Sequence, residues 1–364
     1  MGTLQLPLAK VKKDYPWVKF PFIVSAPMAR VAKPQLAAEV SRAGGLGFVA
    51  AGYTSDTLED WLEETSEILS DDRRTLFRTT DPTVLPVGVG FITWSASLDA
   101  AIGPIQKYRP CAVWLFAPPT GFRDLVPWAT KIRAVTSQKT KIWVQVGSLA
   151  DAVEVAILVQ PDVLVMQGSD AGGHSLARGA SIVSLVPEVC DKFKELQSEL
   201  QKTVTILASG GICDGRGVAA ATNLGAQGCV MGTRFLASPE SLIPQGYQRE
   251  ILRASDGGSS TVRTKIYDKV RDIHGWPEPY NGRGLINRTY LDAVEGMDEK
   301  KNRELYVKEL DKGDEGYGPE GRLTTYAGTA VGLVKEVMPA ADIVVSVREQ
   351  ARQLLHKSVP DSRL

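Results

Sequence analysis

The sequence predicts an α/β fold, a (β/α)₈ TIM barrel with a small, partly helical insertion after the eighth strand. Eight apolar segments occur in the first two thirds of the chain, and each but the last is followed by a helical pattern. Because these segments are apolar throughout, they are typical of parallel strands buried on both faces. Eight such units close most economically into a barrel. An open doubly wound sheet would instead carry Gly-x-Gly-x-x-Gly after its first strand, where this chain has Ala-Pro-Met.

The expected strands and helices alternate regularly. Strands are expected at residues 22–27, 46–51, 84–90, 112–116, 141–146, 163–167, 204–208 and 228–231. The first helix begins at Pro34, because proline suits a first helical turn, and Gly44 and Gly45 end it. Further helices are expected near residues 57–70, 97–107, 121–135, 149–159, 184–200 and 214–224.

The pattern changes after the eighth strand, which predicts three parts. Residues 1–237 form the barrel domain, which starts with a lead-in segment, and the polar, irregular residues 238–325 form a small cap domain. Residues 326–364 return to an amphipathic pattern, which predicts C-terminal helices that complete the barrel. Helical pieces in these last two parts are expected at residues 239–254, 299–311, 327–338 and 340–356.

Composition excludes several classes of function. The 42 basic and 42 acidic residues balance, so the electrostatic signature of a nucleic-acid binder is missing. No apolar run approaches the roughly 18–20 residues of a membrane span. The four cysteines form no Cys-x-x-Cys pair, which indicates a reducing compartment and no metal site. The final Ser362-Arg363-Leu364 is similar to a peroxisomal signal, so we expect a cytoplasmic or peroxisomal protein.

Two glycine-rich turns follow the seventh and eighth strands, the usual position for phosphate in a barrel of this kind. The first turn contains Ser209, Gly210 and Gly211, and the second contains Gly232 and Thr233. Backbone N–H groups and a helix N-terminus can bind an anion there. The alternative is that these glycines only make tight turns, but two such turns in adjacent units favour phosphate.

A single histidine is placed for catalysis. The chain has three, His174, His274 and His356, and only His174 ends a loop of small residues after a predicted strand. Gly172 and Gly173 precede it and allow a ligand to approach the backbone closely. A neutral imidazole suits proton removal at physiological pH. A structural histidine that hydrogen-bonds a loop is the alternative interpretation.

Four stretches carry a resemblance to a known family: PFIVSAPMA (21–29), AGGLGFVAAG (43–52), QGSDAGGH (167–174) and the stretch 208–238 that begins ASGGI. With them the chain resembles the nitronate monooxygenases, formerly called 2-nitropropane dioxygenases. Residues 276–287 (WPEPYNGRGLIN) resemble the insertion of fungal members. The resemblance implies an FMN-dependent oxidoreductase, with residues 1–237 as the FMN-binding barrel.

The resemblance also implies a reaction and a set of site residues. Alkyl nitronates, together with the neutral nitroalkanes from which they form, would be oxidised by O₂ to a carbonyl compound and nitrite, with His174 as the base. Residues at the first strand would present backbone to the isoalloxazine, the glutamines would bind its polar edge or the ribityl chain, and the glycine turns would hold ribityl and phosphate. The expected cofactor-binding residues are Ala26, Pro27, Met28, Gln145, Gln167, Gly172, Gly173, Ser209, Gly210, Gly211, Gly232 and Thr233.

The chain departs from the family pattern around the expected substrate. Asp170 replaces a usual glutamate, Gly90 stands where an asparagine is common, and residues 175–178 (Ser-Leu-Ala-Arg) follow the histidine in place of Arg-Gly. The family stretch CxVSFTFGxP stands here as CAVWLFAPP (residues 111–119). These changes leave the physiological substrate open.

Two alternatives therefore remain: an NAD(P)H-dependent flavin reductase of quinones or activated alkenes, and a tailoring oxidoreductase in a biosynthetic route. Arg30 and Arg178 are candidates to attract an anionic substrate. Tyr326 and Trp276 either roof the pocket or pack the cap, and Cys213 is expected to pack. The sequence leaves the oligomeric state open, with a homodimer as one outcome.

Overall fold

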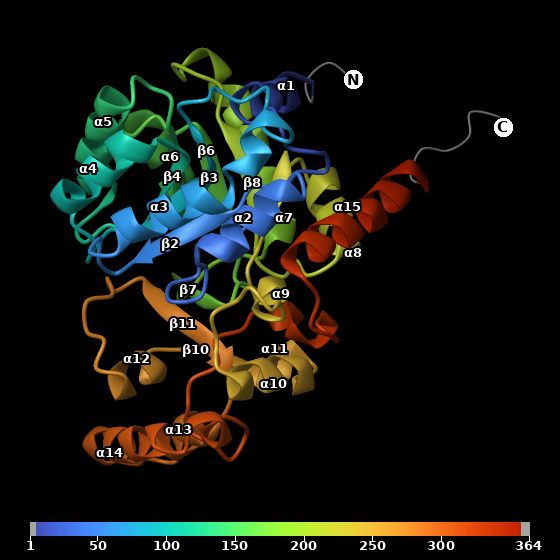
Figure 1. Cartoon of the computed structure of the whole chain (residues 1–364). Helices are drawn as coiled ribbons and strands as arrows, with labels where there is room; N and C mark the ends of the chain where they lie inside the picture. The colour runs from blue at the N-terminus through green and yellow to red at the C-terminus, as the bar shows by residue number, and fades with distance from the viewer. Residues whose placement is uncertain (1–4, 358–364) are drawn as a thin grey trace.

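The computed structural model describes residues 5–357, and eight parallel strands form its centre (Figure 1). The strands are β1 (Ile23–Ser25), β2 (Phe48–Gly52), β3 (Leu85–Ile92), β4 (Pro110–Phe116), β5 (Lys141–Val146), β6 (Val163–Gln167), β8 (Thr205–Ser209) and β9 (Gly228–Met231). Their order in the sheet is β1-β9-β8-β6-β5-β4-β3-β2. A parallel bridge between Val24 and Leu46 joins the two ends of this order. The predicted (β/α)₈ barrel is therefore confirmed.

Helices surround the barrel in the predicted alternation (Figure 1). They are α2 (Pro34–Arg42), α3 (Leu58–Ile68), α4 (Leu98–Tyr108), α5 (Leu125–Val135), α6 (Leu149–Leu158), α7 (Ile182–Glu195), α8 (Gly215–Asn223) and the short α9 (Thr233–Leu236). The last helix, α15 (Ala340–Lys357), packs against both α8 and α2. Within residues 5–357, no helix combines the length and apolar character needed to cross a bilayer.

Aromatic side chains fill the barrel interior below the site. The ring of Phe48 lies 5.2 Å from that of Trp114 and 4.9 Å from that of Trp143. Tyr15 follows an N-terminal helix, α1 (Gln5–Asp14), and its hydroxyl accepts a 2.7 Å hydrogen bond from the indole of Trp143. The lead-in segment therefore closes the N-terminal end of the barrel. The opposite end, where the strands terminate, is not covered by this segment.

The segment after β9 carries a second, three-stranded antiparallel sheet. Its strands β10 (Thr261–Thr264) and β11 (Tyr280–Leu285) pair with β7 (Gly173–Leu176), in the order β10-β11-β7. The helices of this segment are α10 (Gln245–Arg253), α11 (Gly257–Ser260), α12 (Ile266–Val270), α13 (Arg288–Val294) and α14 (Glu299–Leu310). In Figure 1 they lie together at one end of the barrel. The predicted domain boundaries stay predictions.

Two expectations about local structure were wrong. The loop that contains His174 is partly a strand, β7, because it pairs with residues more than 100 positions later in the chain. Residues 327–338 form no α-helix; they contain only a 3₁₀ helix, η5 (Thr329–Leu333). The amides of Gly328 and Thr329 donate to Thr233 and Asp170, so tertiary hydrogen bonds replace the helical ones. The Ser362–Leu364 signal lies outside the described residues.

We predict that Gly88→Ala destabilises the barrel. A Cβ at Gly88 would lie 2.2 Å from the ring of Phe48, which is held between two indoles. Overpacking of this kind costs about 1–3 kcal/mol. Gly258→Ala is the control, because its Cβ would meet no atom closer than 3.9 Å. Urea unfolding followed by tryptophan fluorescence measures both variants, and equal stability of the two would contradict the prediction.

Candidate active site

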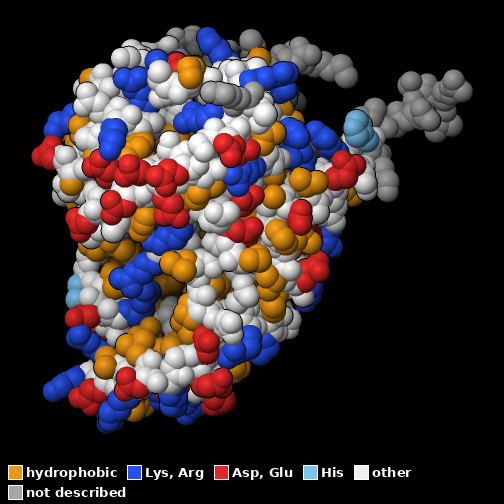
Figure 2. Space-filling view, viewed as in Figure 1, with side chains coloured by type: hydrophobic (Ala, Val, Ile, Leu, Met, Phe, Trp, Pro, Cys, Tyr) orange, Lys and Arg blue, Asp and Glu red, His pale blue; other side chains and the backbone are white. Residues whose placement is uncertain are grey.

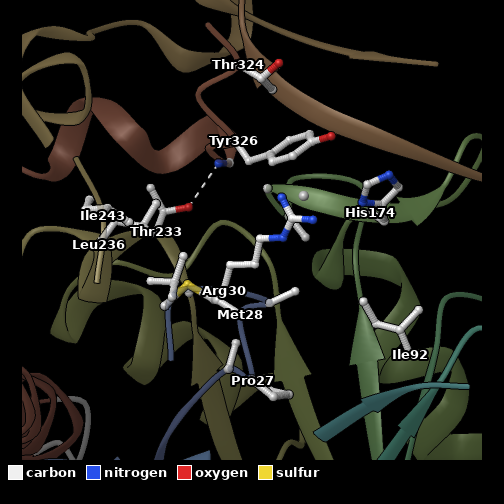
Figure 3. Close-up of a pocket in the computed structure, with 18 of the residues that line it drawn as sticks. Pro27, Met28, Arg30, Ile92, His174, Thr233, Leu236, Ile243, Thr324 and Tyr326 are labelled. Atoms are coloured by element: carbon white, nitrogen blue, oxygen red, sulfur yellow. Dashed lines mark hydrogen bonds between the residues drawn. The ribbon is translucent and has the colours of Figure 1, made fainter. Parts of the chain in front are cut away.

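A cavity of about 670 Å³ lies between the C-terminal ends of the strands and the segment after β9. Figure 2 shows the surface hollowed between these two parts, with apolar side chains around the opening. Every residue predicted from the sequence to bind the cofactor lines this cavity, and so does His174. In Figure 3, His174 and Thr233 face each other across the cavity, with Met28 and Arg30 between them. The structure thus brings the predicted residues together.

The end of β1 forms the floor of the cavity. The amide of Ala26 donates to the carbonyl of Met231 at 2.9 Å, which fixes the backbone from Ala26 to Met28 against the end of β9. The ring of Pro27 packs against Gly90, where a Cβ would lie 2.3 Å from Pro27. Glycine at position 90, one of the departures from the family pattern, is therefore required by the position of Pro27.

The two predicted glutamines belong to one chain of hydrogen bonds. The indole of Trp114 donates to Gln145 Oε1 at 3.1 Å, and Gln145 Nε2 donates to Gln167 Oε1 at 2.6 Å. Gln167 Nε2 then donates to the backbone carbonyl of His174 at 3.1 Å. Each amide nitrogen has a second N–H that this chain does not use. The glutamines can therefore donate to a ligand while they hold His174 in place.

The glycine turns after β8 and β9 have the geometry of an anion site. Gly210 and Gly211 have φ values of +106° and +74°, a conformation that side chains other than glycine rarely adopt. Their amides donate to no residue in the described range 5–357. Asp214 caps α8 by accepting from the amides of Arg216 and Gly217. Thr233 Oγ1 accepts from the amide of Gly328 at 3.0 Å, drawn dashed in Figure 3, and its own proton remains free to donate.

His174 is buried and paired with a carboxylate. Its Nε2 lies 2.9 and 3.0 Å from the two oxygens of Asp268, and the Tyr326 hydroxyl donates to Asp268 Oδ1 at 3.1 Å. The imidazole stacks on Trp276 with ring centres 3.7 Å apart and planes inclined by 6°. Burial lowers the pKa of His174 below its ordinary value of 6.5, although Asp268 acts in the opposite direction. The imidazole is therefore neutral near pH 7 and can accept a proton.

Arg263, on β10, holds the loop before His174. Its guanidinium donates to the carbonyls of Gly173 at 3.0 Å, Ser169 at 3.2 Å and Ala171 at 2.5 Å, and also to that of Asn281 on β11. Burial, helped by the charge of Arg283, lowers the pKa of Arg263 to about 9, so the group stays charged at neutral pH. One side chain thus fixes the shape of the whole loop.

The departures around His174 also have structural explanations. Asp170 accepts from the hydroxyl of Thr329 at 2.9 Å and ties the C-terminal segment to the loop. Ser175 and Leu176 belong to β7 and pair with Asn281 and Tyr280. The stretch 175–178 therefore connects the barrel to the three-stranded sheet, through the pairing of Ser175 and Leu176 with β11.

The remaining candidates divide between the cavity and its surroundings. Arg30, Tyr326 and Trp276 line the cavity, whereas Arg178 is exposed and outside it. Cys213 is buried, and burial raises the pKa of its thiol to about 12, as expected for a packing residue. The sequence prediction missed Asp268 and Arg263, because nothing distinguishes them from the other charged residues of a polar segment.

Comparison with known proteins identifies the family of this chain. A sequence model of the nitronate monooxygenase family matches residues 10–83 and 126–348. The nitronate monooxygenase npaC of Metarhizium robertsii is 47% identical over 345 residues, which cover 94% of each chain. A nitronate monooxygenase of Neurospora crassa is 39% identical over 98% of this chain and 95% of its own.

Solved structures share the fold. FabK from Thermotoga maritima superposes with a TM-score of 0.71 and 26% identity, covering 96% of this chain and 97% of its own. The nitroalkane oxidase of Streptomyces ansochromogenes has a TM-score of 0.70 and 21% identity, covering 96% of this chain and all of its own. The fold and the family match define an oxidoreductase of a flavin-dependent class. The chain belongs to the nitronate monooxygenase family, as its sequence motifs predicted.

We predict that Arg263→Met lowers the free energy of unfolding by about 2–4 kcal/mol, because several buried carbonyls lose a charged donor. Arg249→Met is the control: Arg249 pairs with Glu315 at the surface, and such pairs contribute at most about 1 kcal/mol. Urea unfolding compares the two variants. A loss for Arg263→Met no larger than that for Arg249→Met would show that the loop keeps its shape without the guanidinium.

Proposed function

We propose that this protein uses FMN to oxidise alkyl nitronates, and nitroalkanes after proton removal by His174, with O₂ as the oxidant. The products are a carbonyl compound and nitrite. One observation carries the proposal: a buried, carboxylate-paired imidazole faces two glycine turns across one cavity, and the first turn has amides without a partner among residues 5–357. The names of the relatives from Metarhizium robertsii and Neurospora crassa support nitronates as the substrate class.

The residues of the cavity fit FMN. The free amides of Gly210 and Gly211 and the hydroxyl of Thr233 would bind the phosphate. The spare N–H groups of Gln145 and Gln167 would bind the polar edge of the ring system or the ribityl chain. Ala26, Pro27 and Met28 would support the isoalloxazine, with Gly172 and Gly173 beside the ribityl chain. Bound FMN would supply the electron transfer from the nitronate and the reaction with O₂.

The protein's own part in the reaction is proton transfer, orientation and exclusion of water. A neutral nitroalkane needs a base, and the neutral imidazole of His174 takes the proton from the carbon next to the nitro group. A nitronate has already lost that proton, so His174 only holds it. Trp276 covers one face of the imidazole, and the centre of the Tyr326 ring lies 5.5 Å from the centre of the imidazole. These contacts keep the base in a fixed orientation.

The alternative function is an NAD(P)H-dependent flavin reductase of quinones or activated alkenes, or a tailoring oxidoreductase in a biosynthetic route. Reductases of the wider family carry a similar AGGH loop.

The final tripeptide Ser362-Arg363-Leu364 supports a peroxisomal location. A fluorescent protein fused in front of the intact tripeptide, compared with one that lacks it, tests the location.

We predict that the purified protein is yellow and releases FMN, not FAD, on denaturation. With propionate 3-nitronate it should consume O₂ and release nitrite. Anaerobic NADH should bleach the flavin slowly if nitronates are the substrate, whereas rapid bleaching would favour the reductase. Protein that has no flavin absorption and takes up none of the added FMN would contradict the proposal.

We predict that His174→Asn lowers turnover of neutral nitroethane by about 10²-fold or more, because general-base catalysis contributes about that much. Flavin binding and turnover of the preformed nitronate should be largely retained. His274→Asn is the matched control, since His274 is exposed and outside the cavity. Oxygen uptake measures both substrates, and unchanged nitroethane turnover in His174→Asn would exclude the base role.

A further inference from the structure

We infer that Asp268 is a positioning residue that keeps the proton of neutral His174 on Nε2 and leaves Nδ1 as the atom that takes the substrate's proton. The inference rests on the proposed role of His174 as the base. It assigns a function to a residue of the inserted segment, on α12, far from the barrel motifs in the sequence.

The contact between the two side chains determines which nitrogen carries the proton. Both carboxylate oxygens of Asp268 lie within 3.0 Å of His174 Nε2, and the Tyr326 hydroxyl also donates to Oδ1. An ionised carboxylate only accepts hydrogen bonds, so Nε2 must be the donor. Asp268 as a residue is 4% exposed, and a buried carboxylate without donors would be costly. Imidazole and hydroxyl together supply these donors.

The other ring nitrogen is free. Nδ1 of His174 makes no hydrogen bond with any of the residues 5–357. This atom is not fully buried. Since His174 lines the cavity, Nδ1 is open to it. Because neutral imidazole has one protonated and one unprotonated nitrogen, the lone pair is on Nδ1. The base therefore presents its lone pair to the cavity.

The imidazole cannot easily turn away from this orientation. Trp276 stacks on one face, and the backbone of His174 is paired with Gly282 on β11. A Cβ at Gly282 would lie 3.4 Å from Nε2 and 2.8 Å from Tyr326, so glycine there leaves room for the ring. Rotating the ring by half a turn would replace Nε2 by carbon beside Asp268 and break the contact. Asp268 thus selects both the tautomer and the rotamer.

The charged groups around His174 set the expected effect of a substitution. Asp268 faces it from α12, Arg271 from the end of that helix and Arg263 from β10, with the Tyr326 hydroxyl beside the carboxylate. Burial and the two arginines lower the pKa of His174, and Asp268 alone among them raises it. In Asp268→Asn the pKa of His174 should fall further. The proton transfer then runs from the substrate C–H to a weaker base, and the imidazolium that forms has lost its counterion.

The first test reads the tautomer directly and needs no turnover. The chain has three histidines, so ¹⁵N-histidine NMR of the FMN-loaded enzyme is assigned with His274→Gln and His356→Gln. We expect His174 to be protonated on Nε2 in the unsubstituted enzyme and to lose this single tautomer in Asp268→Asn. A proton on Nδ1 in the unsubstituted enzyme would overturn the inference, even if Asp268→Asn does not fold.

The second test separates positioning from a merely structural role. In Asp268→Asn, kcat for nitroethane should fall by about 10²-fold with little change in KM, and the acidic limb of the kcat/KM profile should move to lower pH. Turnover of the preformed nitronate should be largely retained. Asp314→Asn is the matched control, because Asp314 accepts from the amide of Gly246 in the same segment and lies outside the cavity. It should lower stability and leave the pH profile unchanged.

The outcomes distinguish this inference from the proposed function. If His174→Asn abolishes nitroethane turnover while Asp268→Asn keeps the rate and pH profile of the unsubstituted enzyme, the positioning role is wrong and the base stands. If the unsubstituted enzyme oxidises neither nitronate nor nitroalkane, the proposed function is wrong, and the tautomer measurement still decides whether Asp268 orients His174.

Discussion

The pairing of β7 with β11 is the interaction on which the active site depends. It joins the strand that carries His174 to a segment more than 100 residues later, and Arg263 reinforces it by donating to carbonyls on both sides. Without this pairing, Asp268 and Trp276 would have no fixed relation to the imidazole. A four-residue strand that contains glycine is weak by itself, so the neighbouring strand and the guanidinium provide its stability.

The same pairing encloses the imidazole of His174. Enclosure beneath the inserted segment removes water from the imidazole, which lowers its pKa and favours the form that can accept a proton. Asp268 limits this effect and supplies the charge that an imidazolium requires. Arg30 and Arg271 line the same cavity, so an anionic ligand would meet positive charge near His174.

The two ends of the barrel have opposite properties. At one end, aromatic rings pack so closely that Gly88 and Phe48 leave no room for a methyl group. At the other end, Gly210 and Gly211 have positive φ values, and their amides have no partner among residues 5–357. The rigid, filled end supports the strands whose far ends carry the polar groups. This arrangement lets one end hold the fold while the other performs chemistry.

The sequence alone determined the barrel, its family and the residues that line the cavity, because those depend on local patterns. Apolar strand runs, the glycine turns at residues 209–211 and 232–233, and the AGGH loop are each contained in a short stretch of chain. Only the tertiary structure decided which side chains act on His174. Asp268 and Arg263 are ordinary charged residues in an irregular segment, and their roles arise when antiparallel pairing buries them beside the loop. Their burial and their partners depend on contacts with distant parts of the chain, which no local pattern encodes.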